Sequence, residues 1–120
     1  MLIDRKELMF FLGDLGAEVL PSLIDVYLSD SENTIQKITD AAAAGDYVTL
    51  AREVHTLKGV GSTYCATRIK ERAFALDKKF KNGDDLSGFI DEIMQLVEVI
   101  KATNDEMKQI QADVLAGNPI

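Results

Sequence analysis

The sequence predicts an all-α protein, an antiparallel up-down four-helix bundle with a short additional N-terminal helix. Apolar residues recur at three- and four-residue steps through most of the chain, which is the period of helices with one buried stripe. The chain has only two prolines, and its glycines lie mainly where helices are expected to end. Its 120 residues are enough for one core of aliphatic side chains. Residues 1–120 are therefore predicted to form a single domain.

The N-terminal helix is predicted from a start signal and a break. Asp4 can cap its first turn, and Glu7 follows three residues later, as in a variant of the capping box. The glycines at 13 and 16 end the helix. We expect it to lie as a lid on one end of the bundle.

The second helix is predicted over 17–44, with Gly45 as its stop and Asp46 as the cap of the next helix. Pro21 is acceptable if the first turn begins near it, and otherwise it introduces a kink. The polar segment 29–33 contains no helix breaker, so the helix should continue through it. Its apolar stripe consists of Leu20, Leu23, Ile24, Tyr27, Leu28, Ile35, Ile38 and Ala42.

Three more helices are predicted over 47–64, 66–81 and about 86–114. Asn82 and Gly83 end the middle one, and Asp84, Asp85 or Ser87 is expected to cap the last. Residues 116–120 are expected to be a frayed tail. The three buried stripes are Leu50, Val54, Leu57, Gly61 and Tyr64; Ile69, Ala73, Leu76 and Phe80; and Phe89, Ile93, Leu96, Val97, Ile100, Met107 and Val114.

Charge and composition exclude several classes of function. A formal net charge of −7 argues against nucleic acid and anionic lipid as partners, because both are recognised by concentrated basic surfaces. No apolar run approaches the roughly 20 residues that span a bilayer, and charged residues interrupt the N-terminus, so neither a membrane span nor a signal peptide is expected. One cysteine permits no intrachain disulfide. A cytoplasmic protein is expected.

The single histidine, His55, is predicted to point away from the core. At about 100° per residue, the buried stripe of its helix falls on the opposite side. Mostly small residues and two cations lie within roughly 60° of His55 on the helix surface. They are Val48, Ala51, Arg52, Lys58, Gly59, Ser62 and Ala66.

This surface suits a residue that carries a phosphoryl group. A neutral imidazole is a competent nucleophile near pH 7, and Lys58 can place an ammonium beside an anion attached to the ring. Gly59 costs about 1 kcal/mol relative to Ala in a helix interior, but it leaves the imidazole open to the backbone of another protein. Gly61 lies on the core side, where close helix packing explains it. Arg52, Ser62, Ala51 and Val48 are candidates for the docking surface on geometric grounds.

The stretch HTLKGVGSTYCA resembles the signature of the histidine phosphotransfer (HPt) family. This signature is a histidine followed by x-Leu-Lys-Gly, then small residues, then Gly-Ala and an apolar residue three positions later. His55, Leu57, Lys58 and Gly59 match it, as do Ser62, Ala66 and Ile69. The segments AAAAGDY and RAFALDKKFK are also similar to the family. Together with DLGAEVLPSLIDVYLSD, they look most like the LuxU type, the monomeric shuttles of quorum-sensing phosphorelays.

The resemblance implies a four-helix bundle whose exposed histidine is phosphorylated, usually on Nε2. His55 would be the phosphoryl carrier, Lys58 would stabilise the phosphate and Gly59 would give clearance. The partners would be the receiver domain of a hybrid sensor kinase and that of a response regulator, which would supply Mg²⁺. The chain itself would have no cofactor and no ATP site, and would be a carrier rather than an enzyme.

Two residues depart from the family pattern. Cys65 stands where a glycine is common at the bend between helices, and a residue other than glycine in a left-handed cap costs roughly 1–2 kcal/mol. The turn is therefore expected to differ. Gly61 replaces a position often held by Ser or Ala, which should loosen the end of the helix.

Three alternative functions remain open at this point. A helical scaffold would bind receiver or kinase domains without phosphorylation. A His/Met haem site is formally possible because the chain contains four methionines, although one histidine and one cysteine cannot supply the usual zinc ligands. Cys65 would be a redox site only with an external partner, because the chain has no second thiol.

Overall fold

The computed structural model describes residues 1–12, 16, 18–83 and 85–120. This part of the chain contains five helices and no strand. The prediction of an all-α protein with a short extra N-terminal helix is therefore confirmed. The helices are α1 (Arg5–Leu12), α2 (Leu20–Ala44), α3 (Tyr47–Thr63), α4 (Thr67–Asn82) and α5 (Phe89–Leu115).

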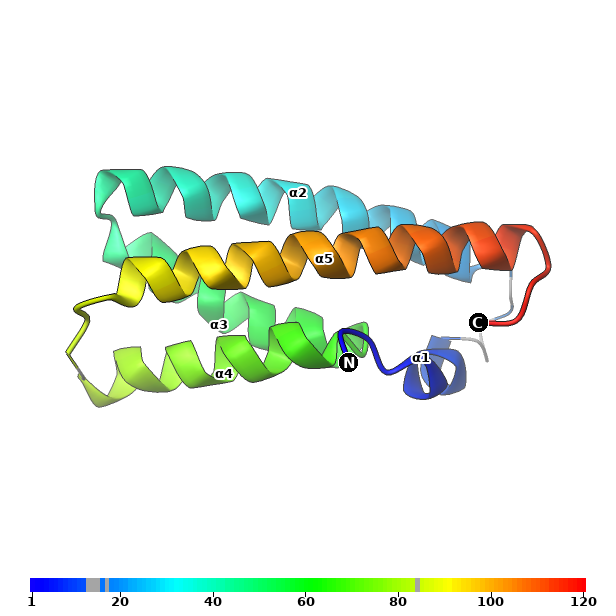
Figure 1. Ribbon diagram of the computed structural model, residues 1–120, viewed down its shortest axis with the longest axis horizontal. Coiled ribbons are helices and arrows are strands. Elements are labelled where there is room, and N and C mark those ends of the chain that lie inside the picture. The colour runs from blue at the N-terminus through cyan, green and yellow to red at the C-terminus, as the bar shows by residue number, and fades with distance from the viewer. Residues whose placement is uncertain (13–15, 17, 84) are drawn as a thin grey trace.

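Helices α2 to α5 form an antiparallel bundle in which each runs opposite to the one before it (Figure 1). Two helices are long, α2 with 25 residues and α5 with 27, whereas α3 has 17 and α4 has 16. At about 1.5 Å per residue, the long pair extends well beyond the short pair at one end. Helix α1 lies beneath this overhang (Figure 1). The predicted lid therefore covers the part of α2 and α5 that the shorter helices α3 and α4 do not reach. No helix in the described ranges is both long and apolar enough to cross a membrane.

The core consists of two apolar clusters. One lies among α2 to α5. The other lies between α1 and the overhanging parts of α2 and α5, and is called the cluster beneath α1. Between them along α2 and α5 lie the buried polar residues Ser31 and Asn104. The Ser31 hydroxyl donates a hydrogen bond to the Asn104 side-chain oxygen at 2.9 Å. Because buried polar atoms need partners, this pair fixes how α2 faces α5. The sequence predicted α2 as continuous through this polar segment, and the structure confirms it.

Most of the predicted helix ends are correct. Side chains of Asp4 and Asp46 accept hydrogen bonds from the backbone N–H groups of the third residue after each, at 3.1 Å in both cases. Gly45 and Gly83 end their helices with a left-handed φ of 66°. Pro21 lies in the first turn of α2, where no intrahelical N–H is needed.

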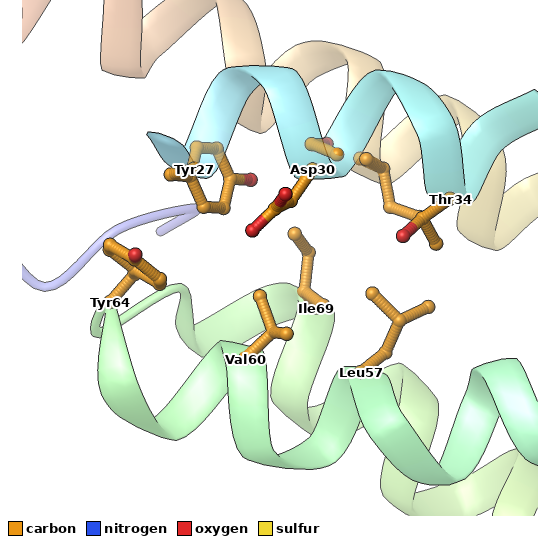
Figure 2. A pocket seen from close by; sticks show the side chains of 9 residues that line it. Tyr27, Asp30, Thr34, Leu57, Val60, Tyr64 and Ile69 are labelled. Atoms are coloured by element: carbon orange, nitrogen blue, oxygen red, sulfur yellow. The ribbon is translucent and has the colours of Figure 1, made fainter. Parts of the chain in front are cut away.

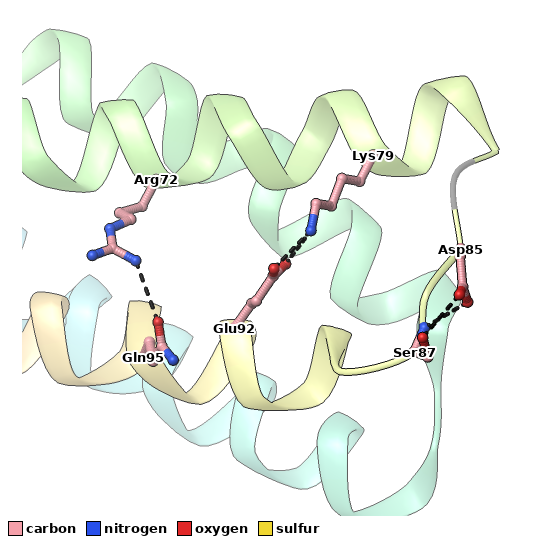
Figure 3. A network of polar contacts seen from close by, with 6 residues as sticks. All are labelled: Arg72, Lys79, Asp85, Ser87, Glu92 and Gln95. Atoms are coloured by element: carbon pink, nitrogen blue, oxygen red, sulfur yellow. Dashed lines mark hydrogen bonds and ion pairs between the residues drawn. The ribbon is translucent and has the colours of Figure 1, made fainter.

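Two predicted helix starts are wrong. Helix α2 begins at Leu20, after Val19, which offers no side-chain cap; residue 17 lies outside the described residues. Helix α5 begins at Phe89 after Gly88, which has a φ of 76°. Asp85 does not cap this helix, because its carboxylate accepts hydrogen bonds from the Ser87 backbone N–H and hydroxyl, both at 2.9 Å (Figure 3). Asp84 lies outside the described residues.

The last residue of the C-terminal segment packs on the fold, which the prediction of a frayed tail did not anticipate, whereas residues 116–119 are exposed. Ile120 is partly buried against the cluster beneath α1. Arg5 donates a hydrogen bond to the Ile120 backbone oxygen at 3.4 Å and forms an ion pair with Glu106 at 3.1 Å. The apolar side chain of Ile120 thus makes a contact that the short segment before it does not predict.

The bend between α3 and α4 keeps the left-handed geometry that glycine usually provides. Cys65 has a φ of 54°, and the backbone N–H groups of Ala66 and Cys65 donate to the carbonyls of Gly61 and Ser62 at 2.9 and 3.4 Å. These two bonds form a Schellman motif. The expectation of a different turn is therefore wrong: the buried Cys65 side chain joins the cluster beneath α1, and that packing offsets the strain.

The glycines of α3 provide a matched test of helix packing. A Cβ added to Gly61 would lie 2.8 Å from the Lys70 backbone nitrogen, whereas one added to Gly59 would meet nothing within 4 Å. Gly61→Ala should therefore lower the free energy of unfolding by about 1–3 kcal/mol. Gly59→Ala should raise it by about 0.4–1 kcal/mol, because a helix interior favours Ala. Urea denaturation measures both, and equal changes would contradict the close approach of α3 and α4.

Candidate functional site

His55 lies on the surface of α3, with 64% of its side chain exposed. The helix is held by Leu50, Val54 and Leu57, which are buried on its opposite face. An exposed imidazole therefore sits on a backbone that is fixed by packing. This is the orientation that the helical rotation predicted.

The imidazole lies beside the carboxylate of Asp77 on α4, a residue that sequence analysis did not select. Asp77 is only 6% exposed, and its Oδ1 lies 3.5 Å from His55 Nδ1. Its other oxygen, Oδ2, accepts hydrogen bonds from Lys58 Nζ at 2.6 Å and Lys81 Nζ at 3.0 Å. The Lys58 hydrogen bond is the main reason that the pKa of Asp77 lies below its usual value; burial opposes this, and Lys81 adds to it. One carboxylate thus joins the imidazole to two ammonium groups.

Lys58 is held between α3 and α4. Its side chain is 16% exposed, and its Nζ lies 5.0 Å from the centre of the Phe74 ring in addition to its contact with Asp77. Both contacts are favourable for an ammonium group. The structure therefore brings His55 and Lys58 together, as predicted, but through a shared carboxylate rather than through the helix surface alone.

Gly59 has no packing role within the described part of the chain, because the position of its missing side chain is open space. Gly61, by contrast, allows α3 to approach the α4 backbone, which confirms the prediction of close packing there. The helix cost of Gly59 is thus unexplained by contacts within the protein. It leaves an open notch one turn from the imidazole.

The other predicted docking residues lie along α3 on both sides of His55 and differ in exposure. Val48 is 72% exposed, Arg52 is also exposed, and Ala51 is half-buried. The Ser62 hydroxyl is exposed, but it donates a hydrogen bond to the Lys58 backbone oxygen at 3.2 Å. Serine at this position is therefore engaged by its own helix.

Sequence analysis missed Asp77 and Phe74, although the position of Asp77 carries a signal. Asp77 follows the core residues Ala73 and Leu76 by four and one positions, so it lies at the edge of the buried stripe of α4. A carboxylate at that position needs a cationic partner. The neighbouring Lys81 pairs with Asp77, and Lys79 pairs with Glu92 of α5 at 2.6 Å (Figure 3).

A small cavity of about 40 Å³ lies between α2 and α3, away from the histidine (Figure 2). Tyr27 and Tyr64 lie at one end of it, and Leu57 and Val60 line the α3 side. The Tyr27 hydroxyl is buried without a hydrogen-bond partner among the described residues, and burial raises its pKa to about 12. Neither His55 nor Lys58 lines this cavity, so it is not part of the histidine site.

Two of the alternative sites can be compared with the structure. Cys65 is buried, and burial raises the pKa of its thiol, which lowers the thiolate fraction at neutral pH. Within the described ranges, no group of three or more His, Cys, Asp and Glu side chains is placed to hold a metal ion.

Residues 22–113, most of the chain, match the family model of the Hpt domain. The chain belongs to the Hpt domain family. It is therefore a histidine phosphotransfer protein of the phosphorelay class, and the function implied by the sequence resemblance is confirmed.

Curated relatives of this Hpt domain protein are similar over much of their length. The chain is 27% identical to phosphorelay protein LuxU of Vibrio vulnificus (strain YJ016) over 115 residues, which cover 96% of this chain and 93% of that protein. It is 27% identical to LuxU of Vibrio harveyi over 79 residues, covering 66% and 69%. For LuxU of Vibrio cholerae, the identity is 22% over 102 residues, covering 85% and 89%. These relatives confirm the resemblance to the LuxU type. No solved structure matches the chain.

The lowered pKa of Asp77 predicts how the stability of this Hpt domain depends on pH. A carboxylate whose folded pKa is depressed stabilises the fold above its unfolded pKa of about 4, and this contribution is lost as the pH falls through the folded value. Asp77→Asn should therefore lower the unfolding free energy by roughly 1–3 kcal/mol near pH 7. The difference from the wild type should shrink below about pH 4. Urea denaturation at several pH values measures this, and a difference independent of pH would contradict the ionised network.

Proposed function

We propose that His55 is the phosphoryl carrier of this protein. It accepts the group from the aspartyl phosphate of a receiver domain, which belongs to a hybrid sensor kinase. It then passes the group to the aspartate of a response regulator. The observation that carries this proposal is the exposed imidazole on a rigid helix, beside a glycine that no packing within the described chain explains.

The geometry around His55 suits an anionic group on the ring. Its Nδ1 faces Asp77, so Nε2 points to the other side of the ring and is the nitrogen available to a partner. Lys58 lies one turn further along α3, and its ammonium is bound to Asp77, the carboxylate that faces the ring. A charge-assisted hydrogen bond from Lys58 would stabilise the phosphoryl group.

The surface beside His55 fits a receiver domain. Val48 of α3 and Phe74 of α4 are exposed apolar side chains, 72% and 57% exposed, and Arg52 adds a positive charge. Apolar contacts would hold the partner, while Arg52 would face the acidic pocket around the aspartate of the receiver domain.

The receiver would supply Mg²⁺, and this chain would bind no cofactor of its own. It would act as a monomer. The name of the relatives, phosphorelay protein, supports a shuttle role.

The alternative against which the carrier role of His55 is tested is a helical scaffold. It would use the same face, with its exposed Val48 and Phe74, to bind receiver domains without phosphorylation. The two candidates differ in whether His55 is needed for more than contact.

Transfer from a phosphorylated receiver domain tests the carrier role. Incubation with the labelled receiver and Mg²⁺ should place acid-labile, alkali-stable phosphate on the wild type and none on His55→Gln. His55 is the chain's only histidine, so no second imidazole can accept the group. Circular dichroism of both proteins should be the same, because the side chain is exposed.

The scaffold candidate predicts the opposite pattern. Across receiver domains from the same organism, the wild type would bind but stay unlabelled. Its binding would equal that of His55→Gln.

Gly59→Leu tests whether the open notch serves partner access. A leucine beside the imidazole should lower the rate of transfer from a receiver domain by about tenfold or more, because a side chain would block the approach of the partner backbone. Phosphorylation by phosphoramidate, a small donor, should change much less. If both donors are slowed equally, the leucine disturbs the imidazole itself and the access argument is wrong.

A further inference from the structure

We infer that the cavity between α2 and α3 is a binding site for the ammonium group of a small primary alkylamine (Figure 2). Its lining combines apolar side chains with polar groups of α2 that can accept hydrogen bonds. The polar groups on which the inference rests are the hydroxyls of Tyr27 and Ser31 and the carboxylate of Asp30. The site is separate from His55, so it goes beyond the proposed function and does not depend on it.

The buried hydroxyl of Tyr27 calls for a ligand in this cavity. The residue is 2% exposed, yet its hydroxyl has no hydrogen-bond partner among the described residues. Figure 2 shows this hydroxyl pointing into the space between α2 and α3. Buried polar atoms in folded proteins nearly always have a partner. Because burial raises the pKa of Tyr27 to about 12, the hydroxyl stays neutral at physiological pH and can accept a hydrogen bond from a bound molecule.

The two other polar groups require a ligand that donates hydrogen bonds. The Ser31 hydroxyl gives its proton to the Asn104 side chain at 2.9 Å, so its oxygen has only lone pairs left to offer. The Asp30 carboxylate also points into the space between the helices (Figure 2), and an ionised carboxylate can only accept. A ligand that fits these groups carries several donors and needs no acceptor. An ammonium group, with three donors and no acceptor, meets this requirement.

The charge and the aromatic rings around the cavity favour a cation. Burial of a cation is costly without a counter-charge, and Asp30, an exposed residue that also lines the cavity, supplies one. The rings of Tyr27 and Tyr64, with centres 5.0 Å apart, lie at one end of the cavity, and aromatic faces attract ammonium ions. The net charge of −7 adds to the attraction for cations.

The rest of the lining and the volume limit the ligand to a short alkyl group. The apolar side chains are those of Leu57, Val60, Ile69 and Ile100. They can cover methyl or ethyl groups, but they offer no oxygen to Ca²⁺ or Mg²⁺, which take about six oxygen ligands. The volume of about 40 Å³ exceeds the roughly 10–15 Å³ that one water needs and is far below the roughly 150 Å³ that holds benzene. The cavity therefore fits methylammonium or ethylammonium.

Titration with ethylammonium chloride, followed in ¹H–¹⁵N NMR spectra, tests the site. Saturable shifts should appear at backbone amides that border the cavity, including those of Ser31 and Val60. A ligand with so few atoms is expected to bind in the millimolar range. Ethanol has nearly the same shape without the charge, and sodium chloride matches the ionic strength. Neither should give saturable shifts at these amides.

Two conservative variants locate the ammonium group. Tyr27→Phe removes only the unpartnered hydroxyl, and Asp30→Asn removes a charge at an exposed position, so both should keep the fold. Each should weaken the binding of ethylammonium by about tenfold or more, the loss typical of one hydrogen bond to a charged group. Glu32→Gln is the matched control and should bind as the wild type does. It removes a carboxylate from an exposed position of α2 that does not line the cavity.

His55→Gln separates this inference from the proposed function. His55 does not line the cavity, so the variant should lose phosphoryl transfer and still bind ethylammonium as the wild type does. Equal shifts with ethylammonium, ethanol and sodium chloride would mean that the cavity holds only water, which overturns the inference. This comparison uses only the wild type, so it holds whatever the stability of the variants. Wild-type affinity in either Tyr27→Phe or Asp30→Asn would also overturn the inference.

Discussion

The close approach of α3 and α4 at Gly61 is the constraint on which the site depends. With no side chain at this position, the α3 backbone lies directly against Lys70 of α4. The two helices are then near enough for Asp77 of α4 to contact both His55 and Lys58 of α3. A larger residue at position 61 would separate the helices and lengthen these contacts. Gly61 is unfavourable in a helix interior, but its lack of a side chain allows α3 and α4 to come close enough to form the site together.

The chain reversal after α3 fixes the same geometry from the end of the helix. Cys65 adopts a left-handed conformation that costs roughly 1–2 kcal/mol for a residue with a Cβ. Its side chain is buried beneath α1, and its backbone oxygen accepts a hydrogen bond from the Asp4 N–H at 2.9 Å. The N-terminal segment is thus attached to the bend that sets the register of α4 against α3. In this way α1 supports the site without lying near the histidine.

Local rules predict features within one helix better than features made by two. The exposure of His55 follows from rotation about α3, and the caps at Asp4 and Asp46 follow from side-chain chemistry next to a helix start. Asp77 could not be placed with His55 from spacing, because their contact depends on how α3 and α4 are rotated against each other. The Ser31–Asn104 bond was missed for the same reason. The start of α5 was missed because Asp85 has a competing partner in its own turn.

The balance of charge around Asp77 explains how an acidic protein can present a site for an anion. The chain carries a net charge of −7, yet at this point one carboxylate faces two ammonium groups. The local excess of positive charge lies beside the imidazole, where a phosphoryl group would add negative charge. Local field rather than net charge governs such an encounter. Without Asp77, two lysines would repel each other beside the ring; with it, they are held in place and still leave the site positive.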